Sequence, residues 1–560
     1  MRKISKVGIV LISSLLLLSI VGMSIVSAQE VKRDIVIQVP YGVGGVSGET
    51  SIRELVDMGD KGLGKTMEIY TATLFEALYP RVKVEFMSWD MWSGKAGERL
   101  LTGLATGSAP AYYYLGHIGG APTAIAKGLV ADLTEFVKNW DQKDNIPMSV
   151  WALCWSKGRC YGIPYDGSCV SDTVWYRKDF YEEAGIFNEE GKPGPPKNWT
   201  IDDFIDICQK ITDPKKMRWG YGLKGGFGCN YDLFAYIFGA PVLRPDPTGK
   251  YTWRAAFSLP EAVKVLEWYK DMQWKYKSVI TGATIGWNET WRDFFAGKVA
   301  MMHNNDGHYL GPVVGKSTQF APRAYEDVVG NAPFPMGSDK IMWNGTIISD
   351  WGINPTMSKE QIKATWDWVT WRWTPSIGRT YRCLRCGDSA SVGQAKAKVK
   401  AEIGEEIPWE YPYIYLPGYD WRAPNLYRDT KGIYERFGIK SWRKKVPQDI
   451  VKLVDTLWAI PKPPQMSAYN VPQERGGDLA TVIQHMVQEV VGTPGKDCLQ
   501  VAKKYEDIAN KTVLNYKVKE QTMEDMKNYY TAVSEFYKKN YPDYYEKTFT
   551  KLYEKYFKVW

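Results

Sequence analysis

The sequence predicts an α/β protein, because strand-like and helix-like segments alternate along its first third. Residues 34–39 form an apolar run typical of a buried strand, and residues 82–86 alternate in the manner of a second strand. Between them, residues 67–78 carry helical apolar spacing, and residues 97–106 continue the pattern with another helix. Strands that alternate with helices indicate a sheet covered by helices.

The same pattern continues into the second half of the chain and then changes. Strand-like runs at 162–164 and 173–176 are followed by predicted helices at 201–211, 259–273 and 359–371. Residues 400–465 are rich in Pro, Trp and Tyr and lack a clear period, which indicates a long irregular excursion. From about residue 497 onward the chain is dense in Lys, Glu and Tyr and indicates helices without strands.

Composition excludes some classes of protein and leaves others open. The 560 residues suffice for two or three domains of roughly 150 residues each. The aromatic share of 14%, with 24 Trp and 36 Tyr, suits either core packing or the binding of sugar rings. The net charge of +8 is spread along the chain without a basic stripe, so we expect no nucleic-acid partner.

The first residues have the order of a secretory signal. Arg2, Lys3 and Lys6 precede an apolar stretch at 7–21, and small residues at 26–28 offer a cleavage site. An uncleaved amino-terminal anchor is the alternative, because the apolar stretch is nearly long enough to cross a bilayer. We therefore expect a signal peptide at 1–28 and an exported protein, periplasmic or extracellular, either released or tethered through this segment.

The cysteines fit an oxidising compartment. Cys154 and Cys160 flank a short turn-like segment, so a disulfide across a hairpin is a candidate. Cys383 and Cys386 form one C-x-x-C, which in an exported chain favours a local disulfide over a redox centre or half of a zinc site. A second C-x-x-C with zinc spacing is absent and the chain has four histidines, so we expect no metal site and no cofactor.

One nucleotide-binding pattern is interpreted as coincidental. Residues 59–66 fit G-x-x-x-x-G-K-[ST], but this phosphate-binding loop needs a buried strand before it. Residues 52–58 are too charged for such a strand. H-E-x-x-H and G-x-S-x-G are both absent, so the motifs do not indicate an enzyme.

Several segments, in a consistent order, carry a resemblance to a known family. They are Phe75–Phe86, Leu101–Pro110, Ala126–Leu133, Gly158–Asp166, Trp175–Asp179, Ala184–Ile186, Pro195–Thr200, Phe294–Met302 and Pro464–Tyr469. With them the chain resembles family 1 extracellular solute-binding proteins of ABC transporters, the maltose-binding-protein-like group, from about residue 34 to 510. The likeness fails around 400–460 and after about 511, and Ala111 stands where the family has Asp.

The resemblance implies a type II periplasmic-binding-protein fold, with two α/β lobes joined by hinge strands around a ligand cleft. By analogy the expected division is 30–170 with 328–355 for the first lobe, 171–327 with 356–510 for the second, and 511–560 for a helical tail. The chain would cross between the lobes near 166–172, 328–335 and 352–355. The Pro-flanked run 331–335 is compatible with an extended crossing.

The resemblance also implies a function. The chain would be the substrate-binding subunit of an ABC importer, a monomer that closes on a sugar or oligosaccharide and delivers it to permease subunits in the membrane. A secreted carbohydrate-active enzyme is the chief alternative, since two carboxylates about 5–9.5 Å apart would suffice for glycoside hydrolysis. A binding lobe of a sensor or surface layer is a third.

Candidate ligand-binding residues combine aromatic faces with planar polar groups, the chemistry that a sugar cleft needs. For the candidate residues after the second and third predicted strands, the alternative is a role in packing or on the surface. For the polar residues after 302, the alternative is a solvated turn. The candidates are Trp89, Asp90, Trp92, His117, Asp166, Asn230, Tyr231, Asn304, Asn305, Asp306, Trp343 and Tyr469.

Overall fold

The structure is a computed structural model. It describes residues 33–41, 72, 75–76, 79–89, 96–140, 143, 151, 154–164, 170–225, 229–280, 286–305, 309, 319–337, 345–347, 350–373, 447–450, 452–453, 474–540, 542–546 and 550.

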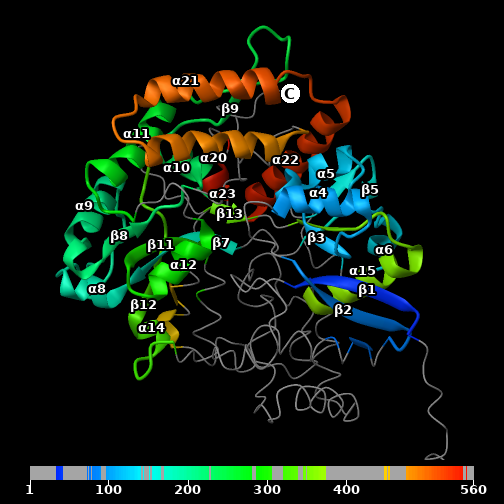
Figure 1. The fold of residues 1–560 in the computed structure, drawn as a ribbon, viewed down its shortest axis with the longest axis horizontal. Coiled ribbons are helices and arrows are strands. Elements are labelled where there is room, and N and C mark those ends of the chain that lie inside the picture. The colour runs from blue at the N-terminus through cyan, green and yellow to red at the C-terminus, as the bar shows by residue number, and fades with distance from the viewer. Residues whose placement is uncertain are drawn as a thin grey trace, which may run out of the picture.

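The described residues bury two separate main hydrophobic cores, one in each lobe of the protein. The first core draws on residues between 37 and 163 and again between 351 and 369. The second draws on residues between 174 and 334 and on the C-terminal helices between 479 and 530. Figure 1 shows the first lobe on the right and the second on the left, so two sheets are each covered by their own helices.

The first lobe contains a parallel strand pair beside a small antiparallel sheet. Strand β1 (Ile35–Tyr41) pairs in parallel with β2 (Val82–Ser88), and both alternate inward-facing apolar residues such as Ile37 and Val84. The antiparallel sheet has the order β3-β14-β6. Its strands are β3 (Tyr112–Tyr114), β14 (Asp350–Ile353) and β6 (Ile163–Pro164).

Helices cover this lobe, and a short hairpin lies between α6 (Thr134–Lys138) and α15 (Lys359–Trp373) in sequence. The hairpin consists of β4 (Trp155–Ser156) and β5 (Arg159–Cys160). The other described helices are α4 (Ala96–Thr106), η1 (Leu115–Ile118) and α5 (Gly120–Ala126).

The second lobe is built on a mixed sheet with the order β12-β7-β11-β8, in which β13 also pairs with β7. Strand β7 runs antiparallel to β11 and β12, whereas β8 runs parallel to β11. Strands β8, β11, β12 and β13 therefore point the same way, opposite to β7, and β7 begins near the ends of β8, β11 and β12. The strands are β7 (Val170–Arg177), β8 (Trp219–Gly222), β11 (Val299–Asn305), β12 (Val329–Ala332) and β13 (Gly345–Ile347).

Capping and apolar spacing explain the helices around this sheet. In α9 (Ile201–Ile211), Thr200 and Asp203 form a reciprocal capping box, and Phe204, Ile207 and Ile211 fill the buried face. A short ribbon of β9 (Leu243–Pro245) and β10 (Trp253–Ala255) lies nearby. The other helices are α8 (Lys178–Glu183), α10 (Tyr231–Ile237), α11 (Pro260–Trp274), α12 (Trp287–Phe295) and α14 (Tyr325–Val328).

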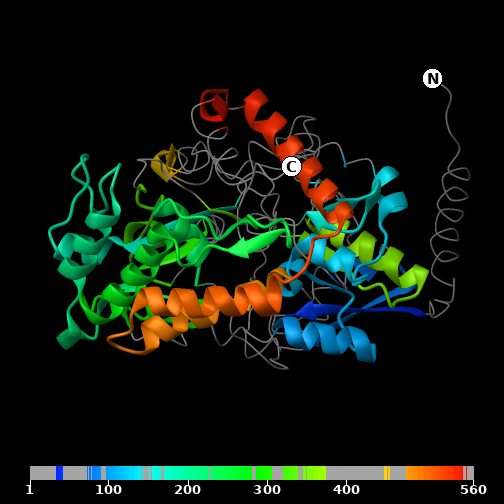
Figure 2. The ribbon, with the colours of Figure 1, turned by 90° about the horizontal axis from the view of Figure 1, so that it is seen from above.

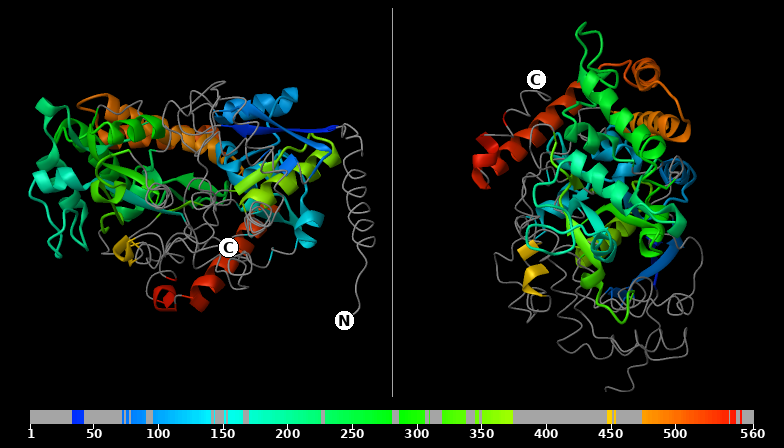
Figure 3. Two further views of the ribbon diagram at one scale, coloured as in Figure 1. Left: turned by 90° about the horizontal axis from the view of Figure 1, so that it is seen from below. Right: turned by 90° about the vertical axis from the view of Figure 1, so that its left-hand side faces the viewer.

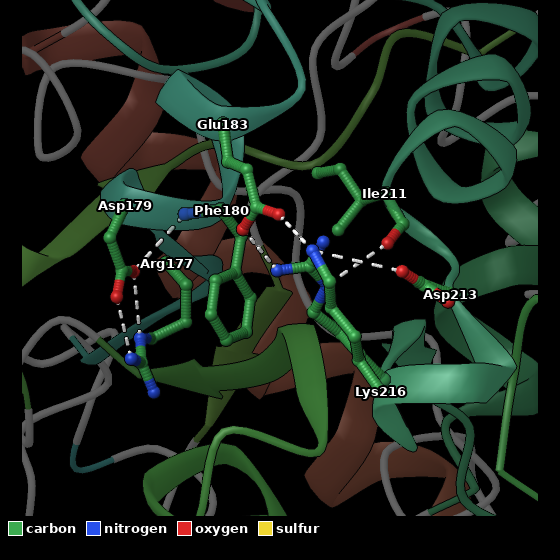
Figure 4. A network of polar contacts seen from close by, with 8 residues as sticks. Arg177, Asp179, Phe180, Glu183, Ile211, Asp213 and Lys216 are labelled. Carbon is green, nitrogen blue, oxygen red and sulfur yellow. Dashed lines mark hydrogen bonds and ion pairs between the residues drawn. The ribbon is translucent and has the colours of Figure 1, made fainter.

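A charged network fastens α8 to the end of β7, as Figure 4 shows. Arg177 binds Asp179 through two hydrogen bonds of 2.7 and 3.0 Å, and its guanidinium carbon lies 4.5 Å from the ring centre of Phe180. Arg218 donates to Glu183 at 2.6 Å and lies 4.6 Å from the same ring. Hydrogen bonds from Arg218, together with Lys216, lower the pKa of Glu183 to about 2.

The C-terminal helices contact both lobes. Helices α20 (Gly476–Gly492) and α21 (Cys498–Ile508) pack on α11 of the second lobe, and the start of α20 reaches η1 and α5 of the first. A π-helical turn, η6 (Ala509–Val513), leads to α22 (Glu520–Asn540) and α23 (Pro542–Tyr544). Figures 2 and 3 show that α22 begins beside the first lobe and runs obliquely to α20 and α21.

The packing places two segments on the other side of the expected division between lobes. Residues 329–332 pair with β7, and Phe334 lies in the second core, so this segment stays with the second lobe. Helix α15 contacts β1, and its Trp368 lies in the first core. Both differences arise because tertiary packing, which local sequence does not encode, decides which core a segment joins.

The expected cross-hairpin disulfide does not form in the structure. Cys154 and Cys160 are fully buried and are recorded as thiols. Cys160 pairs in register with Trp155, so Cys154 lies one position away from the direct cross-strand partner that a bridge would need. Cys383 and Cys386 lie outside the described residues.

The described part of the chain contains no helix that is both long enough and apolar enough to cross a membrane. The expected signal segment, the excursion at 400–465 and the phosphate-loop pattern at 59–66 lie wholly or largely outside the described residues.

Candidate functional site

The candidate site lies where three strands of the second lobe end together. Strands β8, β11 and β12 run in the same direction, and β7 begins at the edge where they finish. In open α/β sheets, ligands bind in the crevice outside the carboxyl ends of the strands. The polar residues at this edge are Thr173, Lys224, Asn230, His303, Asn304 and Asn331, and we call them the second-lobe polar edge.

A histidine organises the middle of this edge. The Lys224 ammonium lies 3.0 Å from His303 Nδ1 and donates to the His303 carbonyl oxygen at 3.3 Å. The Asn230 amide nitrogen also contacts Nδ1. Both groups donate, so Nδ1 accepts and the ring proton lies on Nε2. Lys224 is 3% exposed and His303 is 2% exposed, so both side chains lie inside the second lobe, away from solvent.

Asn230 occupies a backbone conformation that suits asparagine and glycine. Its φ of 56° lies in the left-handed region, directly before α10 begins at Tyr231. The Tyr231 ring is buried and packs edge-to-face on Phe257 at 6.0 Å, and burial raises its pKa. The structure therefore places Asn230 at the edge and Tyr231 in the second core, without an open face for stacking.

Two asparagines complete the edge from β11 and β12, the strands on either side of β7. The Asn304 carbonyl oxygen accepts from Thr173 Oγ1 at 3.3 Å, and its side chain is fully buried. Asn331 is 2% exposed, and within the described residues neither its amide nitrogen nor its amide oxygen has a hydrogen-bond partner. Buried amides are normally satisfied, so Asn331 requires water or another polar group outside the described residues.

Trp89 is the one first-lobe candidate whose side chain the structure describes. Trp89 follows β2 at its carboxyl end, as expected, but it is 3% exposed and belongs to the first core. The Arg99 guanidinium carbon lies 4.8 Å from the Trp89 ring centre. In this structure the ring therefore packs instead of presenting an open face.

The other candidates are placed in part or not at all. His117 belongs to η1 and Asn305 to the end of β11, where it pairs with Asp172, but their side chains are not described. Six candidates lie outside the described residues and stay predictions: Asp90, Trp92, Asp166, Asp306, Trp343 and Tyr469.

Sequence reasoning missed four members of the edge: Thr173, Lys224, His303 and Asn331. The last three each lie near the carboxyl end of a strand, two residues after β8 or within the last three residues of β11 and β12. That position is a usable signal, but only once the relative directions of the strands are known.

The chemistry of the edge is that of non-covalent recognition. Amide side chains supply both donors and acceptors, and the buried ammonium and imidazole hold that of Asn230 in place. Among the residues that the structure describes, no group of three or more His, Cys, Asp or Glu side chains is placed to hold a metal ion.

Solved structures share this architecture. Maltose-bound MalE3 of T. maritima aligns with a TM-score of 0.54 and 18% identity, over 84% of this chain and 100% of that one. The GacH receptor of Streptomyces glaucescens, solved unliganded and with acarbose, gives 0.52 and 17%, over 86% and 99%. An ABC transporter solute-binding protein from Agrobacterium radiobacter, in complex with ribitol, gives the same TM-score, identity and coverage. At these identities the likeness shows the fold, which is the type II periplasmic-binding-protein fold.

Sequence comparison gives the family itself. The sequence matches no curated protein with which it was compared. The model of the bacterial extracellular solute-binding protein family matches residues 60–372, which is more than half of the chain and confirms the resemblance in the motifs. The chain therefore belongs to the bacterial extracellular solute-binding protein family.

Proposed function

We propose that this protein is the extracytoplasmic substrate-binding subunit of an ABC importer, and that it captures a sugar, oligosaccharide or polyol. Membership of an extracellular solute-binding family supports an exported binding protein. Structures of the same fold were solved with maltose, acarbose and ribitol, which supports a polyhydroxylated ligand.

The observation that carries the proposal is the second-lobe polar edge. Asn230, Asn304 and Asn331 bring three amide groups to one edge of a sheet. They lie on or beside the carboxyl ends of strands, where ligands bind in α/β folds. A sugar hydroxyl both donates and accepts, and an amide offers both partners. The Asn230 amide contacts His303, which Lys224 holds in turn, so this amide is pre-oriented and loses little entropy when a ligand binds.

The mechanism follows from the two separate cores. Each lobe has its own core; β6 belongs to the first lobe and β7 to the second, and the chain changes lobe again between β13 and β14. A ligand that contacts both lobes stabilises the closed form because it binds that form more tightly than the open form. The permease subunits then receive a closed, loaded protein, and the ligand leaves chemically unchanged.

The test is a panel of candidate ligands applied to the chain without residues 1–28. A ligand at 100 times its Kd stabilises the folded state by about 2.7 kcal/mol, which is readily visible as a rise in Tm. We expect at least one of maltotriose, acarbose, a chitin oligosaccharide and ribitol to raise the Tm. Mass spectrometry of ligand that co-purifies with the native protein would identify the physiological class directly.

Product analysis separates binding from catalysis. A binding protein returns the oligosaccharide intact after long incubation, whereas a glycosidase generates shorter sugars. Appearance of products in proportion to protein concentration would contradict the proposal. So would a co-purified ligand that carries no hydroxyl-rich group.

A further inference from the structure

The C-terminal segment beyond η6 ties the two lobes together at two points. We call residues 514–526 the strap. They comprise the connection after η6 and the first two turns of α22. The matched family region ends at residue 372, well before the strap.

The first attachment of the strap is on the second lobe. The Val518 amide donates to Thr252 Oγ1 at 2.8 Å, and the Thr252 amide donates to the Tyr516 carbonyl oxygen at 3.4 Å. Thr252 directly precedes β10, and Leu514 and Val518 are buried in the second core. This end therefore moves with the second lobe.

The second attachment is on the hairpin of the first lobe. Asp525 accepts from Ser156 Oγ at 2.8 Å and from the Lys157 backbone amide at 3.3 Å, and Gln521 also donates to Ser156. Hydrogen bonds to an ionised carboxylate are stronger than those between neutral groups. A cavity of about 140 Å³ lies beside this contact, lined in part by Pro122, Trp155 and Met526.

The connection between the two attachments is short and stiff. From Glu520 the strap is helical, and the helix rises about 1.5 Å per residue, so Glu520 and Asp525 lie roughly 7.5 Å apart along it, with only Lys519 between Val518 and the helix. Glu474 accepts from the Lys519 amide at 3.0 Å and further fixes the start of α22. The hairpin held by Asp525 is followed by β6 and then by the passage into β7, where the chain enters the second lobe.

We propose that the strap restrains rotation of the lobes and so sets the equilibrium between their relative orientations. A rotation that moves the hairpin relative to β10 must break the contact at Asp525, because Val518, Met526 and Tyr530 hold the strap in the second core. The contact energy of the strap is then part of the free-energy difference between orientations, and its loss shifts their populations.

The contact at Asp525 makes a distinctive prediction. Asp525 and Ser156 are partners in one contact, so removing either side chain breaks it, and removing both adds little. Two independent stabilising contacts at separate sites would instead have additive effects. The contact is therefore measurable with two single variants and their combination.

The experiment uses the full-length chain without ligand, so its outcome does not depend on the proposed function. Fluorescent dyes are attached through unnatural amino acids at Leu101 and Met217, which are 42% and 64% exposed on the first and second lobes. Single-molecule energy transfer then reports the distribution of distances between lobes. The variants are Asp525→Ala, Ser156→Ala and the double variant. Glu524→Ala, an exposed neighbour on the same helix, is the matched control.

We expect each single variant to change the ratio of interlobe states by roughly threefold to tenfold, the effect of one or two hydrogen bonds. The double variant should match the larger single effect, and Glu524→Ala should leave the distribution unchanged. Should Asp525→Ala fold poorly, Ser156→Ala releases the same attachment from the first-lobe side. Unchanged distributions in folded single variants, or additive effects in the double variant, would overturn the proposal.

Discussion

Gly119 and Gly477 approach so closely that a Cβ atom on Gly119 would lie 2.7 Å from the Gly477 backbone nitrogen. Gly119 belongs to the first lobe, between η1 and α5, whereas Gly477 lies in the first turn of α20. The rest of α20 packs on α11 of the second lobe. This glycine pair therefore lets a C-terminal helix contact both lobes.

We predict that Gly119→Ala lowers the free energy of unfolding. Its φ of 93° is left-handed, which costs an alanine roughly 1–2 kcal/mol. The steric contact with Gly477 adds roughly 1–3 kcal/mol as overpacking. Urea denaturation followed by circular dichroism measures the sum.

Gly128→Ala is the matched control for this substitution. Gly128 also has a left-handed φ, 67°, but a Cβ there meets nothing within 4 Å. Its loss of stability therefore reports the backbone cost alone. Equal losses in the two variants would show that the approach of α20 to the first lobe carries no steric constraint.

The second prediction concerns the contact between α20 and α21. Glu489 accepts from Lys504 at 2.6 Å and from Lys496 at 2.9 Å, with a side chain 18% exposed. The hydrogen bond from Lys504 is the largest cause that lowers the pKa of Glu489, from 4.5 to about 2. A depressed pKa stabilises the fold above the unfolded value, and this contribution is lost as the pH falls from about 4.5 through about 2.

Glu489→Gln should therefore cost on the order of 1 kcal/mol at pH 7, after allowance for solvent screening. The difference between wild type and variant should shrink below about pH 4.5 and nearly vanish near pH 2. Denaturant titrations at pH 7, 4 and 3 follow it. Asp507→Asn, which breaks an exposed pair with Lys511 on α21, should have a smaller effect at every pH. A cost of Glu489→Gln that stays constant with pH would contradict this account.

Local sequence was sufficient to predict those helices and strands that depend on residues near them in the chain. The predicted helices at 201–211 and 259–273 coincide with α9 and α11, because the Thr200 cap and the apolar spacing mark them within one turn. The strands predicted at 34–39 and 82–86 likewise correspond to β1 and β2.

The site depends on contacts between residues that lie far apart in the sequence. Lys224 and His303 meet because β8 and β11 pair in parallel, and Asn331 comes to the same edge because β12 pairs with β7; both pairings are set by tertiary structure. Tyr231 was expected to stack on a ligand, but the burial of α10 against α11 turns its ring into the core. Aromatic residues serve both purposes, so composition alone does not separate them.

The third prediction concerns Asp166, which lies outside the described residues at the expected crossing into the second lobe. The family resemblance places it in contact with ligand. Asp166→Ala should weaken binding at least tenfold while the Tm without ligand changes little. Calorimetry with the ligand found in the panel measures this, and unchanged affinity would remove Asp166 from the site.

The fourth prediction separates the side chain of Asn230 from its backbone. Asn230→Gly keeps the left-handed conformation and removes the amide, whereas Asn230→Ala removes the amide and adds strain. We expect the alanine variant to be less stable than the glycine variant by about 1 kcal/mol.

Ligand affinity should respond differently from stability in this pair. If the amide contacts the ligand, both variants lose the same contact and should weaken binding equally, by roughly tenfold for one hydrogen bond. If Asn230 acts only by shaping the start of α10, binding should instead follow stability, and Asn230→Gly should bind almost as well as wild type. Calorimetric titration of both variants, beside their unfolding curves, distinguishes these outcomes, because the glycine substitution removes the amide without disturbing the turn.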